Sequence, residues 1–402
     1  MGVKVKISPV GLQDMLFFKN LPLTREQTIE QTPLKEVNGT FAVNENAKMM
    51  HPDAQHMIIE SITDRADAKT FLLKKEDGSP AAFFRAGQYV SVLLNINGSL
   101  VTRPYSICSS PALAREGKLE ITVKSNPGGF AAEYMLNDLA VGDKLTVSGA
   151  EGNFFYEELR DSKNVIAVAG GSGITPFLSM AKAVSDGIED FNLTIIYGNR
   201  TKDGILFKKE LDKLCKQCPA IKTVYVLSDE KARGYEKGFV TAELIKKYAP
   251  ADGDYSVFIC GPEAMYRFLE KETEKLGLAA GKVRRELLGV AKNIYERDDY
   301  PKQFKGMTFK LTVKQGFDET VIDAAADETL LAAIEKAGIN APSRCRSGEC
   351  GWCRSKLISG TVYIPSENDG RRFADKKHRY IHPCACYPTS DAVIEVPGSY
   401  LE

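Results

Sequence analysis

The sequence carries no excess of either charge, since 53 Lys and Arg residues balance 53 Asp and Glu residues. This balance gives no reason to expect a nucleic-acid partner or electrostatic attachment to a membrane surface. Runs of 18 apolar residues are also absent, which argues against a membrane-spanning helix. The first residues lack the apolar core of a secretory signal. We therefore expect a soluble, cytoplasmic protein.

A group of cysteines near the C-terminus is the strongest signal in the chain. Cys345, Cys350 and Cys353 have the spacing C-x4-C-x2-C, and Cys384 follows about thirty residues later. This is the plant-type spacing of a [2Fe–2S] cluster, for which a loop supplies three sulfurs and a separate segment supplies the fourth. No His takes a place in this set, which argues against a Rieske centre. A zinc site is disfavoured as well, because the sequence here has neither a repeated C-x2-C nor paired His.

A second cysteine pair, Cys215 and Cys218, also has a spacing that redox motifs use. The pair ends an expected helix over residues 206–214, so its thiolates would lack the stabilising dipole of a helix N-terminus. We interpret these two residues as structural. The cysteines outside the cluster set otherwise sit singly in apolar stretches, which fits a reducing compartment.

The first 55 residues give no clear periodic signal. Residues 39–43 suggest a short strand, and the Asn- and Glu-containing residues 44–47 suggest a turn after it. His51 and His56 could serve as metal ligands, but an ordinary packing extension is the favoured interpretation. We assign residues 1–55 to an N-terminal extension whose role the sequence does not indicate.

Two different patterns follow along the chain and predict two different sheets. Short alternating segments separated by turn residues predict an antiparallel β-barrel over residues 56–157, with strands at 57–62, 70–74, 89–94, 119–123 and 144–148. Apolar runs then alternate with helical stretches, which predicts a parallel α/β sheet over residues 158–287. Its expected strands are 165–169, 193–197, 222–227 and 256–260, and its expected helices are 175–183, 208–214, 241–247 and 263–276.

A charged stretch at residues 288–306 is predicted to link this sheet to a small C-terminal unit over residues 307–402. That unit has expected strands at 308–313 and 320–323, an expected helix at 329–337, and then the cysteine loop.

Two motifs in the barrel region suggest a phosphate-bearing ligand. Arg103 precedes Pro104, Tyr105 and Ser106 at the barrel edge, after an expected strand, and its guanidinium can pair bidentately with a phosphate. Tyr105 offers a flat apolar face and Ser106 a hydroxyl. About twenty residues later, Lys124 is followed by Gly128, Gly129 and Phe130, and the two glycines allow backbone amides to approach a pyrophosphate.

The α/β region contains two further motifs. Gly170, Gly171 and Gly173, followed by Ile174, Thr175 and Pro176, form a turn between a buried strand and a helix. Such a turn presents amides and a helix N-terminus to a dinucleotide, although a G-x-G alone can be only a tight turn. Cys260, Gly261 and Pro262, with Met265 nearby, follow a later strand at the edge where doubly wound folds bind ligands.

Together these motifs resemble the ferredoxin–NADP reductase superfamily, and the C-terminal segment resembles plant-type ferredoxins through Cys384-Ala-Cys386-Tyr-Pro. The resemblance implies a flavin barrel, a nicotinamide α/β domain and an α+β ferredoxin domain of the β-grasp type. It implies FAD, NADH and a [2Fe–2S] cluster as cofactors. It also favours Cys384 over Cys386 as the fourth cluster ligand.

The resemblance assigns roles to the motif residues. It implies that Arg103, Pro104, Tyr105, Ser106, Lys124, Gly128, Gly129 and Phe130 hold FAD. For the nicotinamide it implies Gly171, Gly173, Ile174, Thr175, Pro176, Asn199, Arg200, Asp229, Cys260, Gly261, Pro262 and Met265. Ser106 and Cys260 are expected beside the reacting rings. Asp229 suits a ribose hydroxyl and repels a 2′-phosphate, so NADH is favoured, although Arg200 leaves NADPH open.

Two functions of different classes fit this arrangement. The first is a reductase that passes electrons from NADH through FAD and the cluster to a partner redox enzyme, such as an oxygenase or a demethylase. The second is a redox-responsive binding subunit whose cofactors report a state; the complete hydride route in one chain favours the reductase. Residues 371–379 hold five Lys or Arg against one Asp, so we also expect this basic strip to steer the chain onto an acidic partner.

Overall fold

The computed structural model describes residues 12–31, 41–126, 128–279, 281–286, 289–290 and 293–398. The chain divides into two compact units, Met1–Asn46 and Ala47–Glu402. Helix α1 (Leu12–Gln31) belongs to the first unit, and α2 (Ala42–Met50) crosses the boundary between them. No helix within these described ranges is long and apolar enough to cross a membrane.

The strand predicted over residues 39–43 is wrong, because α2 begins at Ala42. Residues 39 and 40 lie outside the described residues. The helix is favoured by Glu45 in its first turn and Lys48 in its last turn, since each charge complements the helix dipole. The amide of Glu45 donates to the carbonyl of Phe41 at 3.0 Å. A short stretch of this kind carries an ambiguous strand signal, and local helix energetics decide its form.

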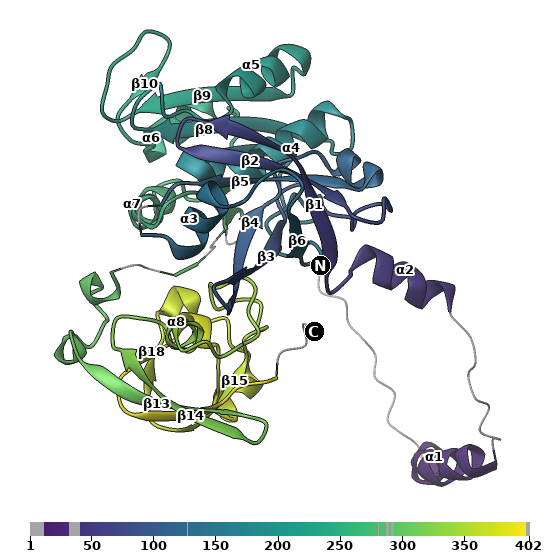
Figure 1. Ribbon diagram of the computed structural model, residues 1–402. Coiled ribbons are helices and arrows are strands. Elements are labelled where there is room, and N and C mark those ends of the chain that lie inside the picture. The colour runs from purple at the N-terminus through teal and green to yellow at the C-terminus, as the bar shows by residue number, and fades with distance from the viewer. Residues whose placement is uncertain are drawn as a thin grey trace. The chain divides into compact units, whose positions relative to one another are not determined.

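The first sheet of the larger unit is antiparallel and forms the expected barrel (Figure 1). The bridge Ile107–Ile121 and the bond from the Cys108 amide to the Glu120 carbonyl bring its two edge strands, β4 and β5, together. Alternate residues such as Met57, Ile59 and Phe71 fill the interior. The strand order is β4-β3-β6-β1-β2-β5. The strands are β1 (Gln55–Arg65), β2 (Ala68–Lys75), β3 (Tyr89–Ile96), β4 (Ser99–Ser106), β5 (Lys118–Lys124) and β6 (Lys144–Val147).

Strand β4 corrects one expectation, since residues 103–106 were predicted to follow a strand and instead lie inside one. Pro104 is accommodated because β4 is an edge strand, where a missing amide donor leaves no internal ladder bond unmade. The barrel also carries η1 (Pro111–Glu116) and α3 (Phe130–Asn137).

The second sheet is parallel, as predicted, and is covered by helices on both faces. Phe177, Leu178 and Leu211 pack on one face, while Ile245 and Leu269 pack on the other. The strand order is β10-β9-β8-β7-β11-β12. The strands are β7 (Asn164–Gly170), β8 (Asn192–Asn199), β9 (Ile221–Leu227), β10 (Glu236–Lys237), β11 (Ser256–Cys260) and β12 (Val283–Arg285). The helices are η2 (Gly171–Ile174), α4 (Thr175–Ser185), α5 (Lys208–Gln217), α6 (Ala242–Tyr248) and α7 (Glu263–Glu274).

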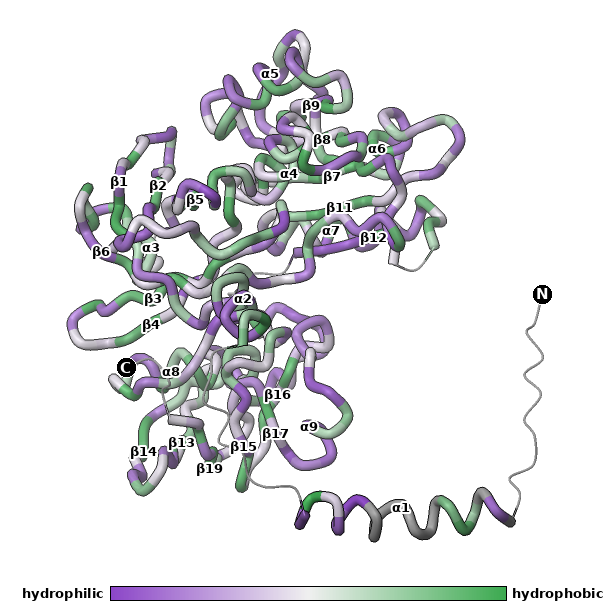
Figure 2. The backbone as a smooth tube through the Cα atoms, turned by 90° about the vertical axis from the view of Figure 1, so that its right-hand side faces the viewer, coloured by the Kyte–Doolittle hydropathy of each residue, from purple (hydrophilic) through white to green (hydrophobic). Residues whose placement is uncertain are grey.

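The two shortest strands, β10 and β12, were not predicted. Figure 2 shows why for β12, which is hydrophilic where the central strands β7 and β11 are hydrophobic. An edge strand has one neighbour only and needs no continuous apolar run.

The C-terminal domain has a mixed sheet of order β14-β13-β19-β15-β17 with α8 packed on it, as expected for an α+β unit. Leu330, Leu331 and Ile334 of α8 are fully buried. The elements are β13 (Thr308–Gln315), β14 (Asp318–Ala325), α8 (Leu330–Lys336), β15 (Ser355–Ser359), β16 (Val362–Tyr363), η5 (Ser366–Asn368), α9 (Phe373–Lys377), β17 (Tyr380–Ile381), η6 (Pro383–Ala385), β18 (Tyr387–Pro388) and β19 (Ala392–Glu395).

The stretch before this domain contains η3 (Ile294–Glu296) and η4 (Lys302–Phe304). It packs on the domain, since Ile294 and Tyr300 are buried against Tyr387. The Tyr300 hydroxyl also donates to the Ala326 carbonyl at 3.1 Å. The predicted linker therefore packs on the C-terminal domain from Ile294 onwards.

Candidate functional site

The structure gathers the four predicted cluster cysteines. The thiols of Cys350 and Cys384 both hydrogen-bond to the Cys345 sulfur, and these contacts lower the pKa of Cys345. Cys353 in turn contacts Cys384. Cys386 is directed elsewhere, because its buried thiol donates to the His382 carbonyl at 3.0 Å. The geometry supports the prediction that Cys384, and not Cys386, completes the set.

Backbone amides surround these sulfurs. The amides of Ser347 and Cys350 donate to Cys345 Sγ, each at 3.4 Å, and the Trp352 amide donates to Cys350 Sγ at 3.5 Å. Gly348 has φ 85°, and a Cβ there would overlap the Asn368 carbonyl oxygen, so the turn accepts only glycine. Amide donors stabilise the thiolate form that a metal requires.

A [2Fe–2S] cluster fits this cradle. The buried Ser347 hydroxyl contacts the Cys345 sulfur and adds a side-chain donor to the backbone amides around it. Across the described ranges, no three or more His, Cys, Asp or Glu side chains gather as ligands of a single ion. A two-iron cluster has no need of such a group, because its four thiolates divide between two irons.

The two nicotinamide motifs meet at the carboxyl ends of neighbouring strands β7 and β11. A Cβ on Gly173 would overlap the Cys260 carbonyl, so the glycine turn runs directly against the end of β11. Met265 packs over both Gly170 and Gly261. Thr175 closes the turn by donating to the Ser172 carbonyl at 2.9 Å, and Pro176 lies in the first turn of α4. Ile174 and Pro262 flank the same edge.

Cys260 differs from Cys345, since burial and the charge of Glu286 raise its pKa. Glu286 follows β12 and is 6% exposed, and its Oε2 has no hydrogen-bond partner. Burial raises the pKa of Glu286 well above its ordinary value. A buried, unpaired carboxyl beside a motif cysteine is a functional-site feature that the sequence did not reveal. Its only sequence signal is a Glu after two Arg in a charged stretch.

The barrel motifs lie on β4 and at the start of α3. Burial raises the pKa of Tyr105 to about 12, and Ser106 is buried beside it on β4. Arg103 is a quarter exposed and pairs with Glu335 at 3.6 Å. Gly128 has φ 75°, Gly129 precedes α3, and Phe130 is 51% exposed. Lys124 pairs with Asp67 at 3.2 Å.

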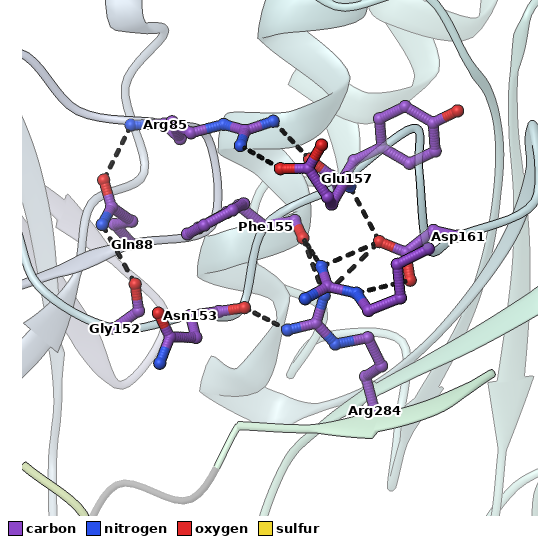
Figure 3. Close-up of polar contacts among 10 residues, drawn as sticks. Arg85, Gln88, Gly152, Asn153, Phe155, Glu157, Asp161 and Arg284 are labelled. Carbon is purple, nitrogen blue, oxygen red and sulfur yellow. Dashed lines mark hydrogen bonds and ion pairs between the residues drawn. The ribbon is translucent and has the colours of Figure 1, made fainter. Parts of the chain in front are cut away.

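A polar network fixes the barrel to the parallel sheet (Figure 3). Arg284 of β12 donates to the carbonyls of Asn153 and Phe155 and contacts Asp161. Arg85 donates to Glu157 at 2.8 Å, and Gln88 donates to the Gly152 carbonyl at 3.0 Å. Because these bonds join the barrel and β12 to the segment that connects the two sheets, they hold the two sheets in one arrangement.

The three parts of the site converge on one region. The charges of both Glu286 and Cys345 act on Tyr89, which is buried on β3. Cys345 also acts on Glu286, which in turn acts on Cys260. The nicotinamide motif, the barrel and the cluster loop therefore lie close to one another.

The predicted nucleotide-selecting residues lie at the same sheet edge. Asn199 ends β8, and the exposed Asp229 follows β9, its parallel neighbour. The Asp229 amide donates to the Arg200 carbonyl at 3.1 Å, so the acidic and the basic side chain share one corner.

Comparisons with known proteins assign all three domains. Residues 54–156 match the family described as oxidoreductase FAD-binding domain, residues 167–271 the oxidoreductase NAD-binding domain, and residues 314–389 the 2Fe-2S iron-sulfur cluster binding domain. NADH-cytochrome b5 reductase 1 of Candida glabrata is 34% identical over 220 residues, which cover 53% of this chain and 75% of that protein. The chain belongs to the ferredoxin–NADP reductase family.

Relatives of this family share the whole architecture. The glycine betaine monooxygenase reductase subunit of Chromohalobacter salexigens is 27% identical over 350 residues, covering 84% of this chain and 94% of that protein. One of the subunits of the Escherichia coli 1,2-phenylacetyl-CoA epoxidase is 28% identical over 346 residues, covering 84% of this chain and 95% of that protein. The structure of phthalate dioxygenase reductase aligns with a TM-score of 0.61 at 24% identity, covering 86% of this chain and 98% of that one.

As a ferredoxin–NADP reductase family member, the protein is an NAD(P)H-dependent iron–sulfur flavoprotein reductase. It uses FAD, a nicotinamide and a [2Fe–2S] cluster, and it transfers electrons to a redox acceptor. The predicted fold class and the predicted cofactors are confirmed.

Proposed function

We propose that this protein is an NADH-oxidising reductase that delivers single electrons to an oxygenase. The names of the full-length relatives support an oxygenase as the acceptor, since two of them serve a monooxygenase and an epoxidase. The observation that carries the proposal is the convergence of Cys260, Glu286 and Cys345 on one region. Because the nicotinamide motif and the cluster motif lie close together, one electron carrier between them is enough.

When bound, the flavin and the cluster supply the conversion of a hydride into single electrons. The chain's own residues bind, orient and exclude water. We assign the flavin phosphates to Arg103 and to the backbone of Gly128 and Gly129. The Ser106 hydroxyl and the flat face of Tyr105 orient the flavin, and the α3 start holds the remaining phosphate.

At the opposite side, the turn at Gly171 and Gly173 receives the dinucleotide phosphates through its amides. Cys260 stays a neutral thiol, because burial raises its pKa, and it packs against the nicotinamide without competing as a base. Burial also raises the pKa of Glu286, which favours the protonated carboxyl that can donate a hydrogen bond there.

NADH is the proposed electron donor. Asp229 is exposed at the end of β9, and Glu230 accepts from the Lys202 amide at 2.6 Å in the same corner. Two carboxylates at this edge repel a 2′-phosphate and accept bonds from ribose hydroxyls. Arg200 is exposed as well and opposes this preference.

One experiment tests both parts of the proposal. Purified protein is assayed with NADH and with NADPH, first with ferricyanide as acceptor and then with the oxygenase encoded beside it or isolated by pull-down. We expect a higher kcat/KM for NADH, and substrate-dependent turnover only when the oxygenase is added. Preference for NADPH would overturn the donor assignment, and an acceptor without oxygenase activity would overturn the acceptor assignment.

A further inference from the structure

Three charged side chains from two domains meet where the flavin phosphate is assigned. Arg103 of β4 lies 3.6 Å from Glu335 of α8. Arg346 of the cluster loop forms a fork on the same carboxylate, with distances of 2.5 and 3.0 Å. Glu335 is 7% exposed, and the side chains of Arg103 and Arg346 are 24% and 14% exposed. The barrel and the cluster loop thus share one carboxylate.

The charges of this group do not balance. Arg346 engages both oxygens of the one carboxylate, which leaves the positive charge of Arg103 less fully paired in a largely buried position. Burial and the neighbouring Arg346 lower the pKa of Arg103, which shows that the remaining charge is poorly solvated. A buried excess charge is costly unless a counter-ion or a ligand completes it.

A second contact between the same two domains lacks this imbalance. Arg344, two residues before Arg346, pairs with the carboxylate of Glu151 and donates to the Asp53 carbonyl at 3.2 Å. Its guanidinium also stacks 3.5 Å above the Trp352 ring. Arg344 therefore suffices to dock the cluster loop with matched charges. The less fully paired charge of Arg103, beside Arg346, calls for a different explanation.

The backbone at Arg346 supports a functional role. Arg346 has φ 56°, in the left-handed region that side chains other than glycine, asparagine and aspartate rarely adopt. Its side chain forks onto Glu335, so a residue in an unfavourable backbone conformation joins the cluster loop to α8.

We propose that Arg346 of the cluster loop is a ligand of the flavin phosphate, which it shares with Arg103 of the barrel. This inference rests on the proposed flavin role of Arg103 and deepens it. The bound phosphate supplies the missing negative charge, and Glu335 holds the two guanidinium groups in a common orientation. The flavin site is then complete only when the cluster domain is docked, so flavin binding and cluster docking reinforce each other.

The test measures flavin affinity rather than turnover. The full-length protein is freed of flavin with its cluster retained, as checked by iron content and visible absorbance. It is then titrated with riboflavin, FMN and FAD, and quenching of flavin fluorescence reports binding. Riboflavin has no phosphate and serves as the internal reference for contacts to the ring.

Arg346→Asn removes the guanidinium but keeps a residue that tolerates the left-handed conformation. We expect it to weaken FMN and FAD binding by about tenfold or more, as for a lost charge-assisted bond, and to leave riboflavin within about twofold. Arg379→Asn is the matched control, because Arg379 also has a left-handed φ of 59° but donates to the carbonyls of Ile358 and Gly360. It should leave all three affinities unchanged.

The variant Glu335→Gln distinguishes a role of Arg346 in binding the phosphate from a role only in holding the two domains together, here called a clamp. Removing the carboxylate raises the net positive charge at Arg103 and Arg346, so FMN and FAD should bind about threefold or more tightly, with riboflavin unchanged. A clamp role predicts the opposite, since breaking the clamp would weaken all three flavins. Unchanged FAD affinity in Arg346→Asn, or equal weakening of riboflavin, would overturn the proposal.

Arg103→Gln distinguishes failure of this inference from failure of the flavin assignment. If Arg103→Gln weakens FMN and FAD binding and Arg346→Asn does not, only the shared site is wrong. If neither variant changes these affinities, the assignment of Arg103 to the phosphate is wrong as well. Should Arg346→Asn lose iron, Arg346→Lys keeps a positive charge without the fork, and we expect it to weaken FMN and FAD binding less than Asn does.

Discussion

The nicotinamide edge and the cluster loop both bring a cysteine to the centre of the molecule, but they build its surroundings in opposite ways. Cys260 ends a buried parallel strand, where Met265 packs close by and the Tyr266 hydroxyl contacts its sulfur. Cys345 lies in a loop, where the amides of Ser347 and Cys350 point at its sulfur. Burial raises the pKa of Cys260, whereas hydrogen bonding lowers the pKa of Cys345.

The difference follows from the backbone each site uses. A parallel strand has its amides engaged with its neighbours, so it can offer a side chain little except packing. A loop with left-handed residues at Arg346, Gly348 and Gly351 has amides free to turn inward. The first arrangement keeps a thiol neutral for contact with a ring, and the second prepares thiolates for iron.

The largest effect is expected from the choice between Cys384 and Cys386, which are two residues apart. Cys384→Ser should abolish or severely perturb the cluster, because Cys384 contacts Cys345 and Cys353. Cys386→Ser should keep it, because Cys386 donates to the His382 carbonyl. Iron content and the visible spectrum measure both variants. Bleaching in Cys386→Ser alone would reverse the ligand assignment.

The second prediction concerns the buried carboxyl at the nicotinamide edge. The raised pKa of Glu286 means that the folded state holds its proton more tightly than the unfolded state. Stability is therefore lost as pH rises from about the ordinary carboxyl pKa towards the raised one. Glu286→Gln cannot ionise, so its thermal midpoint should exceed that of wild type increasingly at higher pH, by roughly 2–4 °C per kcal/mol.

The control for Glu286 is Glu270→Gln, because the Glu270 side chain is 60% exposed on α7. Its midpoint should track wild type from pH 5 to pH 8. A midpoint difference for Glu286→Gln that does not grow with pH would show that Glu286 is ionised in the folded protein, and its proposed role as a hydrogen-bond donor would fail.

The cluster loop and the nicotinamide edge differ in how much of each could be predicted from the sequence. Ligand spacing is fixed along the chain, so the sequence indicated the cysteine loop and its glycines directly. Glu286 and Glu335 act through neighbours far away in sequence, and their local surroundings read only as charged surface. The same limit applied to β4: the turn at Asn97 and Gly98, both with positive φ, indicates a hairpin, but Arg103 and Pro104 break the strand pattern after it.

The third prediction tests the outer corner of the nicotinamide edge. Asp229→Arg should raise kcat/KM for NADPH and lower that for NADH, each by roughly tenfold, because attraction of the 2′-phosphate replaces repulsion. Asp252→Arg makes the same charge change before β11, at the opposite edge of the sheet, and should change neither value. An unchanged preference in Asp229→Arg would place the ribose elsewhere.

The smallest effect is expected at the basic strip of the cluster domain, where the structure alters the expectation. Arg371 and Lys376 both pair with Asp369, at 2.7 and 3.0 Å, so much of their charge is already neutralised. Arg372 and Lys377 are exposed, and neither has an ion pair within the described part of the chain. Between them in sequence, Phe373 is 83% exposed. We therefore assign steering of an acidic acceptor to Arg372 and Lys377.

Replacing Arg372 and Lys377 by Gln should slow electron delivery to the protein acceptor by about two- to fivefold at low salt. The effect should vanish near 1 M salt, where the Debye length falls from about 10 Å to about 3 Å. Reduction of ferricyanide should stay unchanged, because a small acceptor needs no steering. Equal rates of electron delivery for this double variant and wild type across the salt range would show that the exposed charges at α9 have no role in steering.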